Sequence, residues 1–447
     1  MLEKGAPVTP AVAKSSLAPA TLVDAPPSPL RLLASLAGLP GRVGLLSLVP
    51  PPAGLPWRSF IGALPLEVSR ELAPSGGSGP LRMGAPDLWG DVPAWVGLLP
   101  YEAARASLER PRWIPAESRP QPHHVAPVWA RYGAMLVIDH RVGHVFVVGD
   151  DAASVRTLRQ AAERRSESSP DATMTPLPVE AAARHGERVA AALELIRAGD
   201  IYQVNLARRL EVSVAGDLVA VLSRLTRAAP SAWASLIELP GQPSVVSTTP
   251  ELFLHATPSG LVETLPIKGT RRRGTDAASD RAERLALDAD PKERAELAMV
   301  IDLERNDLGK LALIGSVRVP SEPWIATHRT LFHRVARVTA RLPAGVSWRE
   351  LIAATWPSGS VTGAPKVRAM EVIASLEPHR RGLYTGALGC VRRDGSLTLA
   401  MAIRTLTVQD GLGHYHVGGG IVADSDPARE VDETHVKALQ LAASWQR

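Results

Sequence analysis

The pattern of apolar and polar positions predicts short strands in the first third of the chain. Residues 128–148 are rich in apolar and β-branched side chains, as strands are, and the segment Asp-His-Arg-Val-Gly at 139–143 fits the turn of a hairpin. Residues 150–165 then follow a helical pattern. This order predicts a β-hairpin followed by a helix.

A polar stretch punctuated by prolines, residues 166–178, separates this region from the rest of the chain, and we interpret it as a linker. Beyond it, residues 179–198 fit an amphipathic helix, whereas residues 244–249 and 261–267 fit strands. Strands and helices mix without a regular βαβ order. The pattern therefore favours an α+β fold with large antiparallel sheets.

The length of the chain, 447 residues, exceeds what one ordinary core holds. We expect an N-terminal subdomain over residues 30–165 and a catalytic domain over residues 179–447, joined by the linker. Residues 1–29 are rich in Ala, Pro and Ser and lack a charged segment followed by an uninterrupted apolar one. We expect a mobile tail there rather than a signal peptide.

Composition and charge exclude several classes of protein. The formal net charge is +5, but bases and acids are interspersed, residues 271–273 form the only basic cluster, and aromatic residues make up 4% of the chain. This pattern does not predict nucleic-acid binding, and we expect the positive charge to attract a small anionic metabolite instead. The most apolar stretch, residues 30–57, is interrupted by arginines and prolines, so no membrane segment is expected. The single cysteine, Cys390, fits a reducing compartment, and we expect a cytoplasmic protein.

One lysine stands out as a candidate nucleophile. Only seven of the 50 basic residues are Lys, and one of them, Lys268, lies between an apolar run and a glycine in the segment Glu-Thr-Leu-Pro-Ile-Lys-Gly-Thr at 263–270. A guanidinium stays protonated, whereas a lysine can lose its proton when buried and act as a nucleophile. A lysine at a strand end is also commonly a solvated charge.

Two pairs of glutamates have the spacing of one helical face. Glu293 and Glu296 lie three residues apart on a helix expected to begin near Pro291, and Val300 and Leu303 continue that face. Carboxylates on a buried stripe need a partner, because burying an unpaired charge is costly.

The second pair repeats the spacing. Asp426 can cap a helix that has Pro427 at its first position, and Glu430 and Glu433 follow three residues apart. Four carboxylates suit magnesium, which prefers oxygen ligands. The same spacing also fits ordinary solvated helices with lysine–glutamate pairs four residues apart.

Candidate anion-binding groups occur near the C-terminus. Gly418, Gly419 and Gly420 offer successive N–H donors without side chains, although such a run is also typical of a bulge, and Arg404 offers a fork suited to a carboxylate or a rim ion pair. Residues 359–366 superficially resemble a phosphate loop but lack its Gly-Lys-Ser/Thr ending, which argues against nucleotide binding. His414 and His416 would share one strand face, but no third metal ligand is evident.

Six motifs lie at residues 263–270, 290–309, 357–370, 381–387, 402–405 and 418–427. In order and spacing they resemble those of the chorismate-utilising enzymes, the group that holds anthranilate synthase component I, aminodeoxychorismate synthase component I, and the isochorismate and salicylate synthases. The resemblance covers residues 185–445 strongly and an N-terminal segment, 96–102, more weakly. Pro-Ile-Lys-Gly-Thr is similar to the aminodeoxychorismate synthase version, because anthranilate synthases typically carry alanine at the position of Lys268.

The resemblance implies two facing sheets with helices outside and a magnesium site. Glu296 and Glu433 match direct ligands, and Glu293 and Glu430 match close or water-mediated partners. Catalytic roles are implied for Lys268, for Glu251 in proton transfer at the substrate ring, and for His333 beside the substrate. Substrate contacts are implied for Gly269, Thr270, Ser360, Tyr384, Arg404, Gly418, Gly419, Gly420 and Lys437.

The implied chemistry is the amination of chorismate. In a family-type route the amine of Lys268 attacks C2 as the C4 hydroxyl leaves, assisted by Glu251, and ammonia then adds at C4 and expels the lysine. The product, 4-amino-4-deoxychorismate, leads to p-aminobenzoate and folate. Arg272 stands where the family commonly has proline, and Ser360 where many anthranilate synthases have threonine, so the local loop geometry is not implied.

Two alternatives remain open at this stage. The chain is also compatible with anthranilate synthase component I or an isochorismate or salicylate synthase, and, from another class, with a non-catalytic chorismate-binding regulatory subunit. Glutamine hydrolysis needs an activated cysteine, and Cys390 lies in a strand-like run without such a setting. We therefore expect ammonia to come from a separate glutamine amidotransferase subunit.

Overall fold

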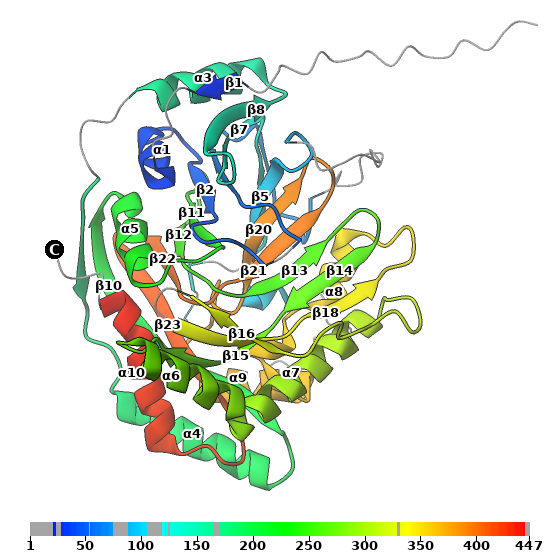
Figure 1. Ribbon diagram of the computed structural model, residues 1–447. Helices are drawn as coiled ribbons and strands as arrows, with labels where there is room; N and C mark the ends of the chain where they lie inside the picture. The colour runs from blue at the N-terminus through cyan, green and yellow to red at the C-terminus, as the bar shows by residue number, and fades with distance from the viewer. Residues whose placement is uncertain are drawn as a thin grey trace, which may run out of the picture.

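Residues 21–23, 28–52, 54–74, 88–104, 119–120, 122–123, 126–164, 170–328 and 331–442 are described by the computed structural model. Their strands form three antiparallel sheets of 12, 8 and 3 strands, and helices cover the outside (Figure 1). The structure thus confirms the predicted α+β class with large antiparallel sheets.

The 12-stranded sheet draws strands from both ends of the chain. Its strand β9 (Ala172–Pro176) pairs only with β10 and lies off the main path. The other strands, in spatial order, are β1 (Thr21–Val23), β8 (His144–Gly149), β7 (Ala134–Asp139), β3 (Arg58–Gly62), β2 (Val43–Leu46), β11 (Ala234–Ile237), β12 (Ser244–Ser247), β22 (Thr405–Gln409), β23 (Leu412–Ile421), β10 (Gln203–Gly216) and β19 (Gly363–Ala364).

The 8-stranded sheet also mixes early and late strands. At its centre β5 pairs with β20, so that Val96 lies opposite Cys390. Its strands, in spatial order, are β18 (Val338–Arg341), β14 (Leu261–Leu265), β13 (Leu252–Ala256), β21 (Leu397–Met401), β20 (Ala387–Arg392), β5 (Pro93–Leu99), β6 (Val128–Arg131) and β4 (Glu67–Ser69).

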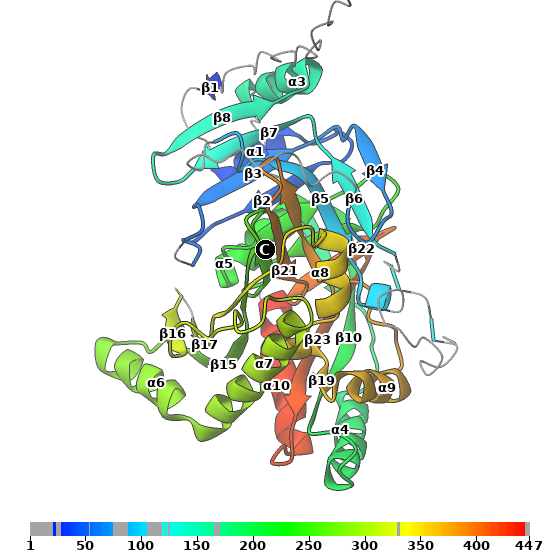
Figure 2. The same ribbon diagram turned by 90° about the vertical axis from the view of Figure 1, so that its right-hand side faces the viewer.

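The small sheet carries the candidate nucleophile and stands to one side of the molecule together with α6, away from α4 and α9 (Figure 2). Its order is β15 (Ile267–Arg272), β17 (Leu331–Val335) and β16 (Trp324–Thr327). The α-helices are α1 (Pro29–Ser35), α3 (Ala152–Glu163), α4 (Ala182–Arg197), α5 (Leu218–Ala228), α6 (Ala277–Ala289), α7 (Pro291–Gly309), α8 (Trp348–Thr355), α9 (Lys366–Leu376) and α10 (Pro427–Ala442), and the short 3-10 turns are η1 (Tyr101–Ala103) and η3 (Gly359–Val361).

The central core lies between the two large sheets. Val137 and Ile237 from the 12-stranded sheet pack in one apolar cluster with Leu98, Leu388 and Cys390 from the 8-stranded sheet. A second cluster joins the 12-stranded sheet to α1, α3 and α5, and a third joins the 8-stranded sheet to α7, α8 and α9. Burial of these apolar faces holds the two sheets against each other and the helices outside them.

The domain division predicted from the sequence does not follow the sheets, since both large sheets contain strands from before and after residue 165. Part of the predicted linker is ordered: Ala172–Pro176 form β9, which pairs with β10. The predicted tail lies mostly outside the described residues, but Thr21–Val23 pair with β8 as β1, so this part is not a free tail. No helix in the described part of the chain is long and apolar enough to cross a membrane.

Candidate active site

Lys268 projects from an irregular position in β15. The register of β15 against β17 shifts between Lys268 and Thr270, and the residue in between, Gly269, has a positive φ of 76°. A bulge of this kind bends the strand and redirects the neighbouring side chain, and glycine adopts its left-handed conformation without a steric penalty. The half-buried Lys268 donates a hydrogen bond from Nζ to the carbonyl oxygen of Ser360 at 3.3 Å.

Glu251 lies beside this lysine and is buried. It precedes β13, and the hydroxyl of Ser360 donates to its Oε1 at 2.8 Å. Burial raises the pKa of Glu251 to about 7, although the hydrogen bond from Ser360 and the charges of Lys268 and Arg404 act in the opposite direction. A carboxyl that titrates near neutral pH is suited to act as a general acid or base.

Arg404 and His333 line a cavity of about 500 Å³, a size typical of small-molecule sites. Burial lowers the pKa of the Arg404 guanidinium, and its φ of 50° places it in the left-handed region, which is a strained conformation for an arginine. A partly desolvated guanidinium favours an anionic ligand.

His333 is buried and neutral. Its Nδ1 and the hydroxyl of Thr270 lie 2.9 Å apart, and burial, followed by the charge of Arg404, lowers its pKa well below the ordinary value. The residue predicted to lie beside the substrate therefore faces the cavity as an uncharged hydrogen-bonding group.

The three glycines of β23 form part of a regular strand. Gly418, Gly419 and Gly420 pair with Ala207, Leu206 and Asn205 of β10. A strand presents its N–H groups alternately to its two sides, so these glycines do not offer three successive free donors, contrary to the expectation from the sequence. Their lack of side chains leaves space beside the backbone instead.

Gly419 and Gly420 border the lysine and the acidic residues. A Cβ on Gly420 would lie 3.6 Å from Nζ of Lys268 and 2.4 Å from Nε2 of Gln203. A Cβ on Gly419 would lie 3.2 Å from Oε2 of Glu430 and 3.4 Å from Oε1 of Glu433. The floor of the site is therefore bare backbone between the lysine and the acidic residues.

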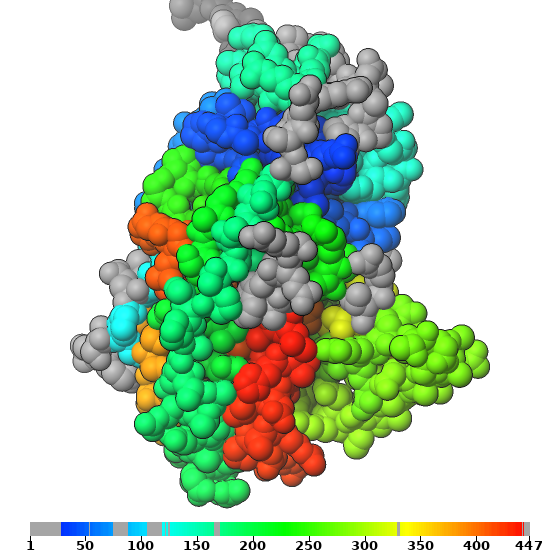
Figure 3. All heavy atoms as spheres, turned by 90° about the vertical axis from the view of Figure 1, so that its left-hand side faces the viewer, coloured from blue at the N-terminus to red at the C-terminus, as the bar shows by residue number. Residues whose placement is uncertain are grey.

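The four predicted glutamates come together from α7 and α10. Helix α7 begins at Pro291, as the sequence predicted, and Asp290 caps it by accepting hydrogen bonds from the N–H groups of Lys292 and Glu293. Helix α10 lies between α4 and α6 on the face shown in Figure 3. Helices α7 and α10 thus bring Glu293 and Glu296 close to Glu430 and Glu433.

A lysine ammonium lies among these carboxylates. Nζ of Lys292 is 3.8 Å from Oε1 of Glu296 and 3.8 Å from Oε1 of Glu430. Burial would lower the pKa of Lys292, but the four glutamate charges outweigh it and raise that pKa. Burial and the neighbouring charge of Glu296 raise the pKa of Glu293 to about 6. The cluster is therefore rich in negative charge and favours a cation.

The donor set fits magnesium in its chemistry, since it consists of carboxylate oxygens. In the described ranges, however, no group of three or more His, Cys, Asp or Glu is already arranged to hold an ion. The predicted surface pair of Glu433 and Lys437 is present as well, at 2.6 Å, and Lys437 also donates to the carbonyl oxygen of Gly418 at 2.6 Å.

Tyr384 and the two histidines of β23 pack against other side chains. Tyr384 is buried, its ring stacks on His416 with centroids 4.9 Å apart, and it lies near the Arg381 guanidinium. His414 stacks on His123 at 3.8 Å. The two histidines of β23 thus serve as packing partners in this structure.

Sequence reasoning missed two buried acids of α7. Glu304 and Asp307 are 1% and 2% exposed, and they continue the stripe of Val300 at offsets of four and seven residues. The same argument that singled out Glu293 and Glu296, a carboxylate on an apolar stripe, applies to them. The hydroxyl of Ser358 donates to Glu304 Oε1 at 2.7 Å, and both Lys366 and Lys310 form ion pairs with Asp307.

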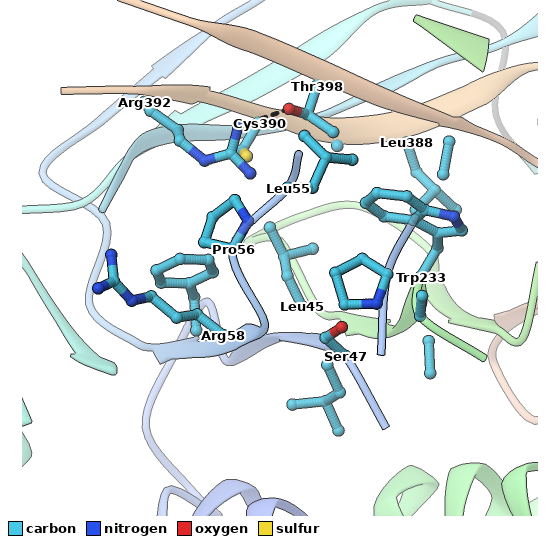
Figure 4. Close-up of a pocket in the computed structure, with 17 residues that line it drawn as sticks. Leu45, Ser47, Leu55, Pro56, Arg58, Trp233, Leu388, Cys390, Arg392 and Thr398 are labelled. Atoms are coloured by element: carbon cyan, nitrogen blue, oxygen red, sulfur yellow. Dashed lines mark hydrogen bonds between the residues drawn. The ribbon is translucent and has the colours of Figure 1, made fainter. Parts of the chain in front are cut away.

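A second, smaller cavity lies between the two large sheets (Figure 4). It has a volume of about 60 Å³, enough for a few water molecules, and its lining includes Leu45, Ser47, Trp233 and Cys390. Burial raises the pKa of the Cys390 thiol to about 11, so the thiol stays protonated at neutral pH. As predicted, Cys390 is a small buried residue.

Comparisons with known proteins identify similar chains. A family model described as chorismate binding enzyme matches residues 71–443. Anthranilate synthase component 1 of Streptomyces coelicolor is 35% identical over 457 aligned positions, which cover 94% of this chain and 87% of that protein. Aminodeoxychorismate synthase component 1 of Salmonella typhimurium is 36% identical over 321 positions, covering 69% of this chain and 68% of that protein.

Among solved structures, anthranilate synthase component I from Streptococcus pneumoniae superimposes with a TM-score of 0.71 at 25% identity, covering 89% of this chain and 94% of that chain. This similarity agrees with the two facing sheets and outer helices described above. The relatives carry different names, so they establish the substrate class more firmly than the product. The chain belongs to the chorismate-utilising enzyme family that includes the anthranilate and aminodeoxychorismate synthases.

Proposed function

We propose that the chain is component I of an aminodeoxychorismate synthase, which converts chorismate and ammonia to 4-amino-4-deoxychorismate and water for p-aminobenzoate and folate synthesis. The observation that supports this product is the position of Lys268. Its Nζ lies 3.3 Å from the carbonyl oxygen of Ser360, whose hydroxyl holds Glu251. Ser360 thus forms hydrogen bonds with both the proposed nucleophile and the proposed acid–base group.

The first step forms a bond between Nζ of Lys268 and C2 of the substrate while the C4–O bond breaks. Glu251 gives its proton to the departing hydroxyl, which leaves as water. In the second step ammonia forms the bond to C4, the bond between C2 and Nζ breaks, and one proton from the new amine returns to Glu251. Splitting the substitution in this way replaces one difficult displacement with two easier ones.

The substrate carboxylates find complementary charge at two places. Arg404 presents its guanidinium to the cavity that His333 also lines. On the other side, Glu296 and Glu433 would bind Mg²⁺ directly, with Glu293 and Glu430 close by, and the bound ion would supply positive charge for the ring carboxylate. The glycines of β23 allow the substrate to approach the backbone between these groups.

Ammonia would come from a partner. The component 1 names of the relatives fit a chain that works with a second, glutamine-hydrolysing subunit. The buried and protonated Cys390 supports the same conclusion, because a thiol of this kind is a poor nucleophile.

One assay tests the proposal. The purified chain is incubated with chorismate, ammonium and magnesium, and the product is identified by its mass and fluorescence. We expect a non-fluorescent product with the mass of 4-amino-4-deoxychorismate. Fluorescent anthranilate or salicylate, or the mass of isochorismate, would assign the chain to another branch of the family, and no turnover would favour a regulatory role.

A further inference from the structure

Four buried side chains form a continuous row of oxygen atoms beneath the site. Ser360 Oγ lies 2.8 Å from Glu251 Oε1, the two serine hydroxyls of Ser360 and Ser358 lie 2.9 Å apart, and Ser358 Oγ lies 2.7 Å from Glu304 Oε1. Each of the four residues is at most 5% exposed. The row connects a carboxyl of the active site to a carboxyl of α7 that the proposed reaction does not use.

A count of hydrogen atoms shows how many protons this row holds. Three oxygen–oxygen contacts of hydrogen-bond length need three hydrogens, and the two serine hydroxyls supply two. If both carboxyls were ionised, each serine would donate to its own carboxylate and no hydrogen would remain for the contact between Ser358 and Ser360. The third hydrogen therefore comes from a carboxyl, so one of the two acids is protonated.

Two arrangements satisfy the count. With the proton on Glu251, each hydrogen points along the row toward Glu304, whereas with the proton on Glu304 each points toward Glu251. The two arrangements interconvert when three hydrogens each move across one contact, and the total charge of the row stays at −1. The backbone N–H of Ser360 donates to Ser358 Oγ at 3.1 Å in both cases and fixes that hydroxyl in place.

Charged side chains surround both ends of the row. Lys268 and Arg404 face Glu251, whereas Asp307 and Lys366 face Glu304. Asp307 is in turn paired with Lys310 and Lys366. Burial raises the pKa of both glutamates, which favours a protonated carboxyl at either end of the row.

We propose that Glu251 and Glu304 share one proton through Ser360 and Ser358, and that Glu304 is a positioning residue that switches Glu251 between its acid and base forms. The inference rests on the proposed function for its use: Glu251 must be an acid when the hydroxyl leaves and a base when ammonia adds. When the proton rests on Glu304, Glu251 is ionised, and transfer along the row gives Glu251 the proton that it passes to the departing hydroxyl. The proton that the new amine releases returns to Glu251, so the row again holds one proton at the end of the cycle.

Infrared difference spectroscopy of the substrate-free protein at neutral pH tests the shared proton directly. We compare the wild type with Glu304→Gln and with Glu251→Gln, because an amide N–H donates into the row and orders it toward the remaining carboxylate. A shared proton predicts that each variant alone loses the carboxylic acid band. If only one of them loses the band, the proton belongs to that residue alone and the inference is wrong.

The control is Thr362→Val, which alters a buried hydroxyl of the same loop that donates to the carbonyl oxygen of Ser358 and does not belong to the row. This variant should keep the band. Should Glu304→Gln fail to fold, Ser358→Ala keeps both acids and breaks the row, and the band should shift because its hydrogen-bond partner is lost. An unchanged band in Ser358→Ala would contradict the inference.

Kinetics provide a second measurement. Removing the charge of Glu304 lowers the pKa of Glu251, so the alkaline limb of the kcat profile should move to lower pH by about one unit in Glu304→Gln. It should stay in place in Thr362→Val. An unmoved limb in Glu304→Gln would refute the positioning role, and because the infrared measurement needs no substrate, it stands even if the proposed reaction proves wrong.

Discussion

Gly420 and Lys268 belong to different sheets, yet a Cβ on the glycine would lie 3.6 Å from Nζ of the lysine. The backbone of β23 therefore forms one wall of the space in front of the candidate nucleophile. A side chain added there occupies the volume that a substrate needs to reach the amine.

The first prediction follows from that contact. Gly420→Ala should lower kcat/KM for chorismate by about tenfold or more, because the methyl group displaces Gln203 and crowds Lys268. Gly309→Ala is the matched control, since no atom lies within 4 Å of its added Cβ. Steady-state kinetics and thermal denaturation of both variants separate a blocked site from a damaged fold. Equal kcat/KM values for Gly420→Ala and the wild type would show that the substrate does not bind beside Gly420.

The second prediction concerns the nucleophile. Lys268→Arg keeps the positive charge but should lose nearly all activity, because a guanidinium does not become a free amine. Lys310→Arg, a change at a half-exposed lysine, should remain active. Mass spectrometry of the wild type quenched during turnover should find a substrate-derived adduct on Lys268, and wild-type rates in Lys268→Arg would exclude the covalent route.

The third prediction concerns magnesium. Glu296→Gln and Glu433→Gln should each raise the magnesium concentration needed for half-maximal activity and lower turnover, because each removes a carboxylate from the cluster. Replacing His414, which stacks on His123, should leave the magnesium titration unchanged. A glutamine variant with the titration curve of the wild type would show that the altered residue is not a ligand.

The fourth prediction concerns stability and pH. Burial raises the pKa of Glu102 from 4.5 to about 7. Between these values the folded state keeps the proton and the unfolded state releases it, so stability is full at low pH and falls as pH rises, by at most about 1.4 kcal/mol per pH unit. We expect Tm to fall from about pH 5 to about pH 7, and to fall less in Glu102→Gln, whose amide is neutral throughout. Parallel curves for the two proteins would contradict the prediction.

The fifth prediction concerns the source of nitrogen. The pure chain should use ammonium but not glutamine, because the Cys390 thiol is buried and its pKa is raised to about 11. Glutamine should support synthesis only after an amidotransferase subunit is added. Product formation from glutamine by the pure chain, lost in Cys390→Ser, would overturn this prediction.

The sequence predicted local features well because they depend on neighbouring residues. The hairpin of β7 and β8, helix α4 and the start of α7 at Pro291 all lie where the sequence pattern predicted them. Spacing along a helix likewise indicated which glutamates share a face. These patterns depend on residues close together in the sequence, so they can be interpreted without knowledge of the fold.

Pairings between distant segments could not be predicted in the same way. Strand β9 was predicted as part of a linker. Its partner β10 lies beyond α4, and the sequence of a short polar strand does not by itself indicate a strand. Glu304 was missed because its proposed role depends on its connection to Ser358 and Ser360, which come close to it only in the folded chain. The arrangement of Gly418 to Gly420 also required knowledge of their pairing with β10.

The interleaving of early and late strands has a consequence for biosynthesis. Strand β5 pairs with β20, with Val96 opposite Cys390, so β5 has no partner on this side until β20 has been synthesised. Pairings so remote in sequence give a high contact order, which slows folding and exposes apolar strand edges meanwhile. A truncated product that ends before β20 can complete neither large sheet, and we expect chaperones to hold the nascent chain until its last strands are made.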